Sequence, residues 1–159
     1  MRFESLTDLC QRAPTPLGTT DWIPITEEDV LAFAKATRAE EWIHVDRERA
    51  VREGPFGTPV AHGFLTLSLA TYAQTQFLDL PPGCVGVNYG VASARFPSHV
   101  PVGASVRASG QVVEAQPVPG GARVTVRLTF EVEGGAKPAC VADVISLVVA
   151  PPDAATFAS

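Results

Sequence analysis

The longest apolar run in the chain reads GFLTLSLATYAQTQF, from Gly63 to Phe77. Its apolar residues do not alternate with polar ones, and its length suits a helix better than a strand. The polar residues within it are Thr, Ser and Gln, and none of them carries a charge. A helix of this composition is apolar nearly all round. The run therefore predicts a central helix whose whole circumference is buried.

The chain after Pro81-Pro82-Gly83 has the alternating apolar pattern of β-strands. We expect strands over residues 84–96, 104–116, 122–133 and 137–150, with hairpin turns at Pro119-Gly120-Gly121 and Glu133-Gly134-Gly135. These strands would form a four-stranded antiparallel meander. A strongly curved sheet of this kind would wrap around the central helix, which makes the predicted fold class α+β.

The region before the central helix is predicted to hold short elements. Helices are expected over residues 3–12, 26–38 and 46–52, a short strand over 21–25 and an irregular connection over 39–44. Thr26 and Asp46 are the expected N-cap residues of the second and third helices, because their side chains accept hydrogen bonds from the first turn.

Length and composition predict a single domain over residues 1–159, with a core of about 21–149, an N-terminal extension over 1–20 and a frayed tail over 151–159. The net charge of −5 and the lack of a Lys/Arg-rich run argue against nucleic acid as a partner. No apolar run reaches about 18 residues, so no membrane span is expected. The start of the chain has no apolar secretory segment. Three widely spaced cysteines predict reduced thiols in the cytoplasm.

Two of the three histidines, His44 and His62, flank the Gly/Pro-rich stretch that leads into the central helix. The ordinary pKa of histidine lets both protonation states exist near neutral pH, so His44 is a candidate for proton transfer. A histidine near a helix end is also often purely structural, and both interpretations stay open. The spacing of these histidines, Asp46 and the glutamates matches no dedicated metal motif, so neither a metal nor another cofactor is expected.

Several ordered motifs resemble the MaoC-like dehydratase family, in particular its nodulation protein N-like branch. They are Trp42–Asp46, Phe56–Leu69, Asn88–Gly90, Arg95–Pro97, Val100–Gly103 and Lys137–Ala142. The resemblance covers roughly residues 21–149 and implies a hot-dog fold, in which a curved antiparallel sheet wraps a central helix. It also implies a homodimer or a dimer-of-dimers assembly. Active members of the family resemble (R)-specific enoyl-CoA hydratases.

The resemblance implies a site for an acyl-CoA or acyl-carrier thioester. His44 would act as base or acid, and the Gly63 N–H would donate to the thioester oxygen. His62 would orient the loop, and Arg95 would contact either a CoA phosphate or the partner subunit. The residues implied in substrate binding are Phe56, Gly57, His62, Asn88, Tyr89 and Arg95.

One position departs from the family's pattern. The family's usual second catalytic group is an aspartate five residues before the histidine, and this chain has Ala39 there. Glu40 or Glu41 is the expected substitute carboxylate. The alternatives are an acyl-CoA-binding protein that has lost its catalytic pair, and a hot-dog thioesterase.

Overall fold

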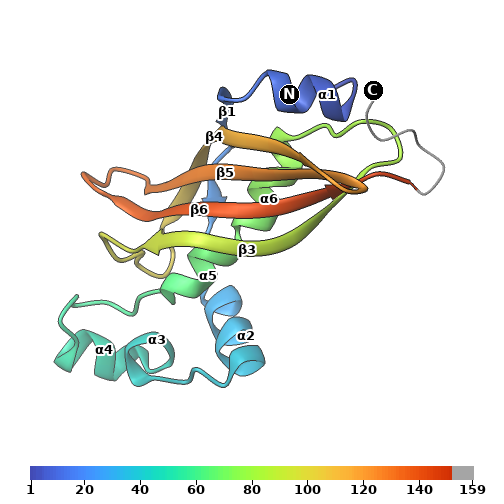
Figure 1. The fold of residues 1–159 in the computed structure, drawn as a ribbon. Helices are drawn as coiled ribbons and strands as arrows, with labels where there is room; N and C mark the ends of the chain where they lie inside the picture. Colours follow the sequence, from blue (N-terminus) through green and yellow to red (C-terminus); the bar gives the residue numbers. More distant parts are fainter. Residues whose placement is uncertain (152–159) are drawn as a thin grey trace.

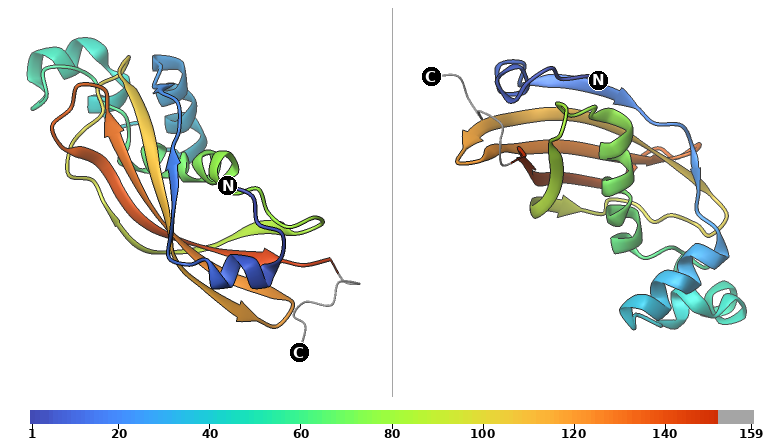
Figure 2. Two further views of the ribbon diagram at one scale, coloured as in Figure 1. Left: turned by 90° about the horizontal axis from the view of Figure 1, so that it is seen from above. Right: turned by 90° about the vertical axis from the view of Figure 1, so that its right-hand side faces the viewer.

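The computed structural model describes residues 1–151, so most of the expected frayed tail lies outside the described residues. A curved antiparallel sheet lies against two consecutive helices (Figures 1 and 2). Its strands are β1 Thr15–Thr19, β2 Ile23–Pro24, β3 Val85–Arg95, β4 Ser105–Val118, β5 Gly121–Val132 and β6 Pro138–Val149. The predicted α+β hot-dog fold is confirmed.

The strand order is β1-β4-β5-β6-β3, with β2 also pairing with β4. The four long strands and both hairpins lie close to their predicted bounds. The predicted meander is wrong in one respect, because β3 pairs with β6 and not with β4. The connection between β3 and β4 carries Pro97 and Pro101, which cannot donate ladder hydrogen bonds. This connection leaves the sheet, and β5 and β6 lie between β4 and β3.

The central helix is a pair, α5 (Gly63–Ser68) and α6 (Ala70–Phe77), that meets at Leu69. The buried side of α6 packs Ala70, Ala73 and Phe77 into the larger core cluster, together with residues of the sheet. The other side is open, since Phe64 is 67% and Tyr72 is 46% exposed. The prediction of a fully buried circumference is therefore wrong for the single chain, because the sheet covers only one side of the helix pair.

Residues 1–20, predicted as an N-terminal extension, contribute four buried side chains to the core, those of Phe3, Leu6, Leu9 and Leu17. Helix α1 (Leu6–Gln11) is shorter than predicted, but Phe3 and Leu9 are completely buried in the larger core cluster. β1 pairs with β4 at the edge of the sheet. This strand has no alternating pattern and contains Pro16, which an edge strand tolerates. Sequence patterns therefore did not predict a strand there.

Three helices project beyond the end of the sheet near the start of α5 (Figure 1): α2 (Glu27–Thr37), α3 (Trp42–Val45) and α4 (Arg47–Glu53). The predicted caps are present, with Thr26 forming a full capping box and Asp46 accepting from the Arg49 N–H. The irregular connection expected at 39–44 instead contains α3. This three-helix segment, residues 26–53, positions one wall of the candidate site.

Candidate active site

A hollow of about 360 Å³ lies where the three-helix segment meets the start of α5. Its walls come from α3, from the loop before α5, from the first turns of α5 and from the connection after β3. Its lining includes His44, Phe56, Gly63, Thr66, Phe96 and His99. The Gly/Pro-rich loop shapes this hollow because Val60 and Ala61 are buried and bonded to the neighbouring segments, with the Ala61 N–H donating to the Val100 carbonyl at 2.8 Å.

The His44 ring is held by its Nδ1, which donates to the Val60 carbonyl at 2.6 Å. A carbonyl oxygen only accepts, so the neutral ring carries its proton on Nδ1 and leaves the Nε2 lone pair free. Burial lowers the pKa of His44, and the neighbouring His62 lowers it further. The Val60 hydrogen bond and the Glu41 charge oppose this shift without reversing it. His44 is thus a neutral base near neutral pH.

His62 is stacked on His44, with ring centroids 3.7 Å apart and an interplanar angle of 29°. Only 6% of the residue is exposed. Its Nε2 donates to the Ala39 carbonyl at 2.8 Å, so the neutral ring leaves Nδ1 unprotonated. Among the described residues, Nδ1 is a buried side-chain atom with no hydrogen-bond partner. This arrangement fits His62 as a residue that supports the His44 ring and ties the loop to residue 39.

The two candidate carboxylates differ in position. A Glu41 carboxylate oxygen and one ring nitrogen each of His44 and His62 all lie within 4.8 Å of one another. Both glutamates are exposed, but Glu40 does not belong to this group of three side chains. The structure thus brings Glu41, but not Glu40, to the histidine pair. Ala39 contributes only its backbone carbonyl.

Gly63 begins α5 and faces the aromatic ring of Phe96. A Cβ at this position would lie 3.0 Å from Phe96 Cδ1, closer than side chains normally approach. The first helical hydrogen bonds to the His62 carbonyl come from Leu65 and Thr66, and none from the Gly63 N–H is found in the described part of the chain. The N–H at the start of a helix lacks an intrahelical acceptor, which leaves it available to a ligand oxygen.

The remaining predicted site residues are spread more widely. Phe56 lines the hollow and its ring centroid is 4.4 Å from that of His99, whereas Gly57 only forms the adjoining turn with φ of 66°. Asn88 and Tyr89 lie on β3 beside the helix pair. Arg95, at the end of β3, is exposed and does not line the hollow.

The lining residues that sequence reasoning missed include Thr66, Phe96 and His99. The sequence pattern predicts Thr66 to be a core residue, because it lies within the apolar run. Phe96 and His99 follow the end of β3 in a turn-rich segment, and only the crossing of that segment over the start of α5 brings them to the site. The sequence carries no periodic signal for such a crossing.

Glu41, His44 and His62 are also the group of side chains in residues 1–151 whose atoms could hold a metal ion. One nitrogen of each histidine is already donating to a carbonyl, so His44 Nε2 and His62 Nδ1 would be the available ligands. The expectation that the protein uses no metal stays a prediction.

The comparison with known families decides the relationship. The MaoC like domain matches residues 10–134. The chain belongs to the MaoC-like family. It is 48% identical over 149 residues to the 3-hydroxyacyl-thioester dehydratase Z of Mycobacterium tuberculosis, covering 93% of this chain and 98% of the relative. It is 37% identical to the nodulation protein N of Rhizobium leguminosarum bv. viciae, with 91% of both chains covered.

Solved structures share the fold. The monoamine oxidase regulatory protein of Archaeoglobus fulgidus superposes with a TM-score of 0.77 at 25% identity, covering 96% of this chain and 98% of that one. The (R)-hydratase of A. caviae superposes with a TM-score of 0.67 at 22% identity, covering 88% and 99% of the two chains. These likenesses confirm the family that the sequence motifs predicted. Within residues 1–151, no helix is both long and apolar enough to cross a membrane.

Proposed function

We propose that the protein is a MaoC-like dehydratase that adds water reversibly to the 2,3 double bond of an enoyl thioester, giving a 3-hydroxyacyl thioester. The observation that carries the proposal is the free Nε2 of His44 in the same hollow as the Gly63 N–H. Membership of the family and the relative named a 3-hydroxyacyl-thioester dehydratase support it.

In the hydration direction, the Gly63 N–H donates to the thioester oxygen and stabilises the negative charge that develops there. Two proton transfers complete the reaction. A base takes a proton from water as its oxygen bonds to C3, and an acid delivers a proton to C2. His44, which is neutral, takes the proton from water, and this proton then passes through the His44–Glu41 pair to C2, so both side chains end the turnover as they began it. The same groups act in reverse when water is eliminated.

The carrier of the acyl group is either CoA or an acyl-carrier protein, both of which present the thioester through the same chemistry. Arg95 is placed near the end of β3, close in sequence to Phe96 of the hollow. From there it would contact either a phosphate of the carrier or a partner subunit.

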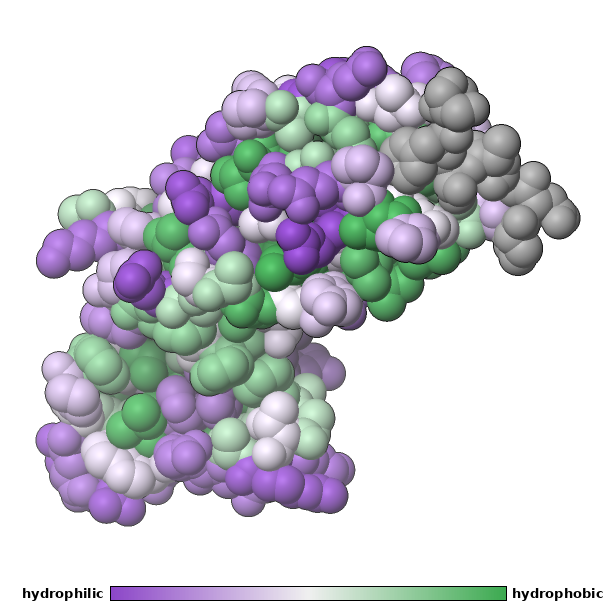
Figure 3. Space-filling view, viewed as in Figure 1, coloured by the Kyte–Doolittle hydropathy of each residue, from purple (hydrophilic) through white to green (hydrophobic). Residues whose placement is uncertain are grey.

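The working unit that we propose is a homodimer, with a dimer of dimers as the larger form. β3 is an edge strand, and its Val85, Val87, Tyr89 and Val91 are exposed apolar residues. Apolar residues gather along the side of the sheet where β3 runs (Figure 3). A second copy pairing along β3 would satisfy the open backbone edge and cover these side chains together with the exposed side of α5 and α6.

The reaction class is tested with crotonyl-CoA, by following the loss of enoyl absorbance and the release of free thiol in parallel. We expect loss of enoyl absorbance without thiol release, and an unchanged rate in the presence of a metal chelator. Thiol release without hydration would show a thioesterase instead. Binding of the CoA ester with neither reaction would show a non-catalytic acyl-CoA-binding protein, the alternative favoured by the alanine at position 39.

A further inference from the structure

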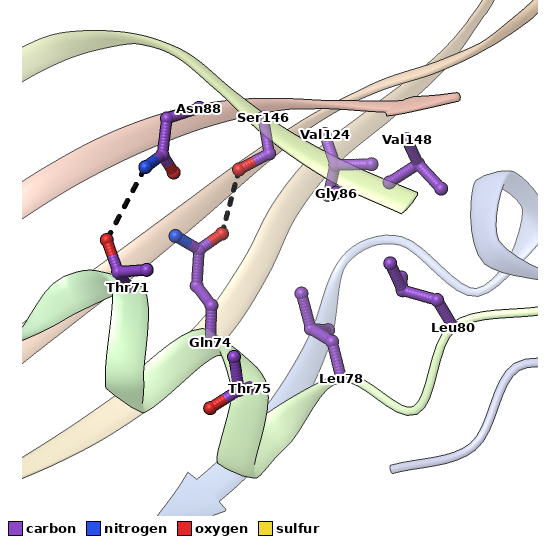
Figure 4. Close-up of a pocket in the computed structure, with 10 residues that line it drawn as sticks. All are labelled: Thr71, Gln74, Thr75, Leu78, Leu80, Gly86, Asn88, Val124, Ser146 and Val148. Carbon is purple, nitrogen blue, oxygen red and sulfur yellow. Dashed lines mark hydrogen bonds between the residues drawn. The ribbon is translucent and has the colours of Figure 1, made fainter. Parts of the chain in front are cut away.

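A second cavity, of about 140 Å³, lies between α6 and the strands β3, β5 and β6. We call it the α6 pocket; Figure 4 shows its lining residues, which are Thr71, Gln74, Thr75, Leu78, Leu80, Gly86, Asn88, Val124, Ser146 and Val148. One end is apolar, with Leu78, Leu80 and Val148. The other end gathers polar side chains from the helix and from two strands.

The polar end is organised by Gln74 and Ser146, which are 8% and 6% exposed. The Ser146 hydroxyl donates to Gln74 Oε1 at 2.9 Å. This bond turns the Gln74 amide nitrogen toward the space near Thr71 and Asn88 (Figure 4). Among the described hydrogen bonds, none involves Gln74 Nε2. The polar end of the pocket therefore contains an amide donor that is open to a ligand.

The chemistry of the pocket selects a neutral ligand group. All ten lining residues are uncharged. An ionised carboxylate or ammonium would lose its hydration there without gaining an opposite charge. A keto or hydroxyl oxygen would accept the hydrogen bond from Gln74 Nε2, and alkyl carbons would contact Leu78, Leu80 and Val148.

The reaction hollow and the α6 pocket lie along the same helix pair. The start of α5 lines the hollow with Gly63 and Thr66. A shallower depression follows along Leu67 and Thr71 beside β3, and it shares Thr71 and Asn88 with the α6 pocket. To reach the α6 pocket, an acyl chain whose thioester lies at Gly63 would follow this surface along the helix pair.

We propose that the α6 pocket binds the acyl chain beyond the reacting carbons and prefers a chain that carries a neutral oxygen, as a keto or hydroxyl group, over a plain alkyl chain. This inference rests on the proposed function, because it assigns the pocket to the same acyl substrate. It identifies Gln74 as the specificity-determining donor and Ser146 as the residue that positions it.

The test compares CoA esters of equal chain length. A series of keto-decanoyl-CoA esters, differing in the position of one keto group beyond C3, is compared with decanoyl-CoA by calorimetric binding, which needs no turnover. The matching 2-decenoyl esters are compared by kcat/KM. One ligand hydrogen bond predicts that the best keto ester binds about 3- to 10-fold more tightly than the alkyl ester.

The decisive variant is Gln74→Leu combined with Ser146→Ala, which removes both partners and leaves no hydroxyl without its acceptor. We expect it to lose the keto preference, while Gln76→Leu, the same change at an exposed position of α6, keeps it. Thermal unfolding checks that each variant is folded. Equal or tighter binding of decanoyl-CoA by the wild type, or a keto preference that survives in the double variant, would overturn the inference. Absence of hydration with an intact keto preference would overturn only the proposed reaction.

Discussion

Glu41 is the N-cap residue of α3, yet its carboxylate makes no capping hydrogen bond and lies beside two histidines instead. Its neighbour Glu40 points to no described partner. The chain thus offers a matched pair of adjacent exposed glutamates, of which only Glu41 lies beside His44 and His62. Their contrast is the most direct probe of how the site works without an aspartate at residue 39.

Glu41→Gln should lower kcat for crotonyl-CoA hydration by about 10²-fold or more, because an amide cannot take or deliver the second proton. Glu40→Gln, the same change one residue earlier, should leave kcat within about twofold of the wild type, as expected for an exposed side chain. Steady-state kinetics of the three proteins measure the contrast. Equal losses in both variants, or a loss only in Glu40→Gln, would remove Glu41 from the mechanism.

The pH profile should report His44. To act as a base, His44 must be neutral in the enzyme without substrate. Burial holds the pKa of His44 below the ordinary histidine value. The rate kcat/KM should therefore be at its plateau at neutral pH and should fall only as the pH drops below about 6.5. In Glu41→Gln the residual activity should have its acidic limb at still lower pH, because the charge that raises this pKa is gone. An acidic limb at higher pH in Glu41→Gln than in the wild type would contradict the assignment of this limb to His44.

At the scale of elements, the packing of α6 against the sheet positions the walls of the reaction hollow and of the α6 pocket. Phe77 ends α6 and lies over Gly110 of β4, where a Cβ would come within 2.8 Å of two ring carbons. Only glycine permits this approach. The contact fixes the C-terminal end of the helix pair, whose first turn, in α5, lines the reaction hollow.

Gly110→Ala should destabilise the fold by about 1–3 kcal/mol, because the Phe77 ring must move within a packed core. Gly90→Ala is the matched control in another strand, where the added Cβ meets no atom within 4 Å. Its free energy of unfolding should change by less than about 0.5 kcal/mol. Chemical denaturation of both variants measures the difference. A Gly110→Ala variant as stable as the control would show that α6 is not tightly seated on the sheet.

Sequence patterns predicted the long elements well and their pairing less well. The alternation in residues 122–133 gave β5 and its buried face, and Thr26 and Asp46 gave the starts of α2 and α4. The position of β3 beside β6 was not predictable from local patterns, because strand order depends on where the connection after β3 crosses. The same connection brings Phe96 and His99 to the site.

The site was predicted through motifs more than through chemistry. The segment around His44 and the start at Gly63 were recognised from their resemblance to the family, and the structure places both in one hollow. The choice between Glu40 and Glu41 needed coordinates, because only the fold shows that Glu41 lies beside His44 and His62. Gln74 and Ser146 gave no signal at all, since they are far apart in sequence and each is unremarkable within its own element.

At the scale of the whole molecule, the exposed apolar residues of β3 predict a homodimer. Val87→Arg should shift the protein toward the monomer, because an arginine would introduce a charge where two copies meet. Val51→Arg is a matched control, since Val51 is also exposed but lies on α4. Light scattering after gel filtration compares the masses of the variants with that of the 16.8 kDa chain. A monomeric wild type, or a dimer unaffected by Val87→Arg, would contradict this interface.

The central claim, that this hollow hydrates an enoyl thioester with His44 as a proton-transfer group, is tested most directly by one rate. The measurement is kcat for crotonyl-CoA hydration by His44→Asn, a variant whose folding is checked by thermal unfolding. The account predicts that wild-type protein hydrates crotonyl-CoA and that the variant is slower by about 10²–10⁴-fold. A folded variant that keeps its rate within about threefold of the wild type would contradict it.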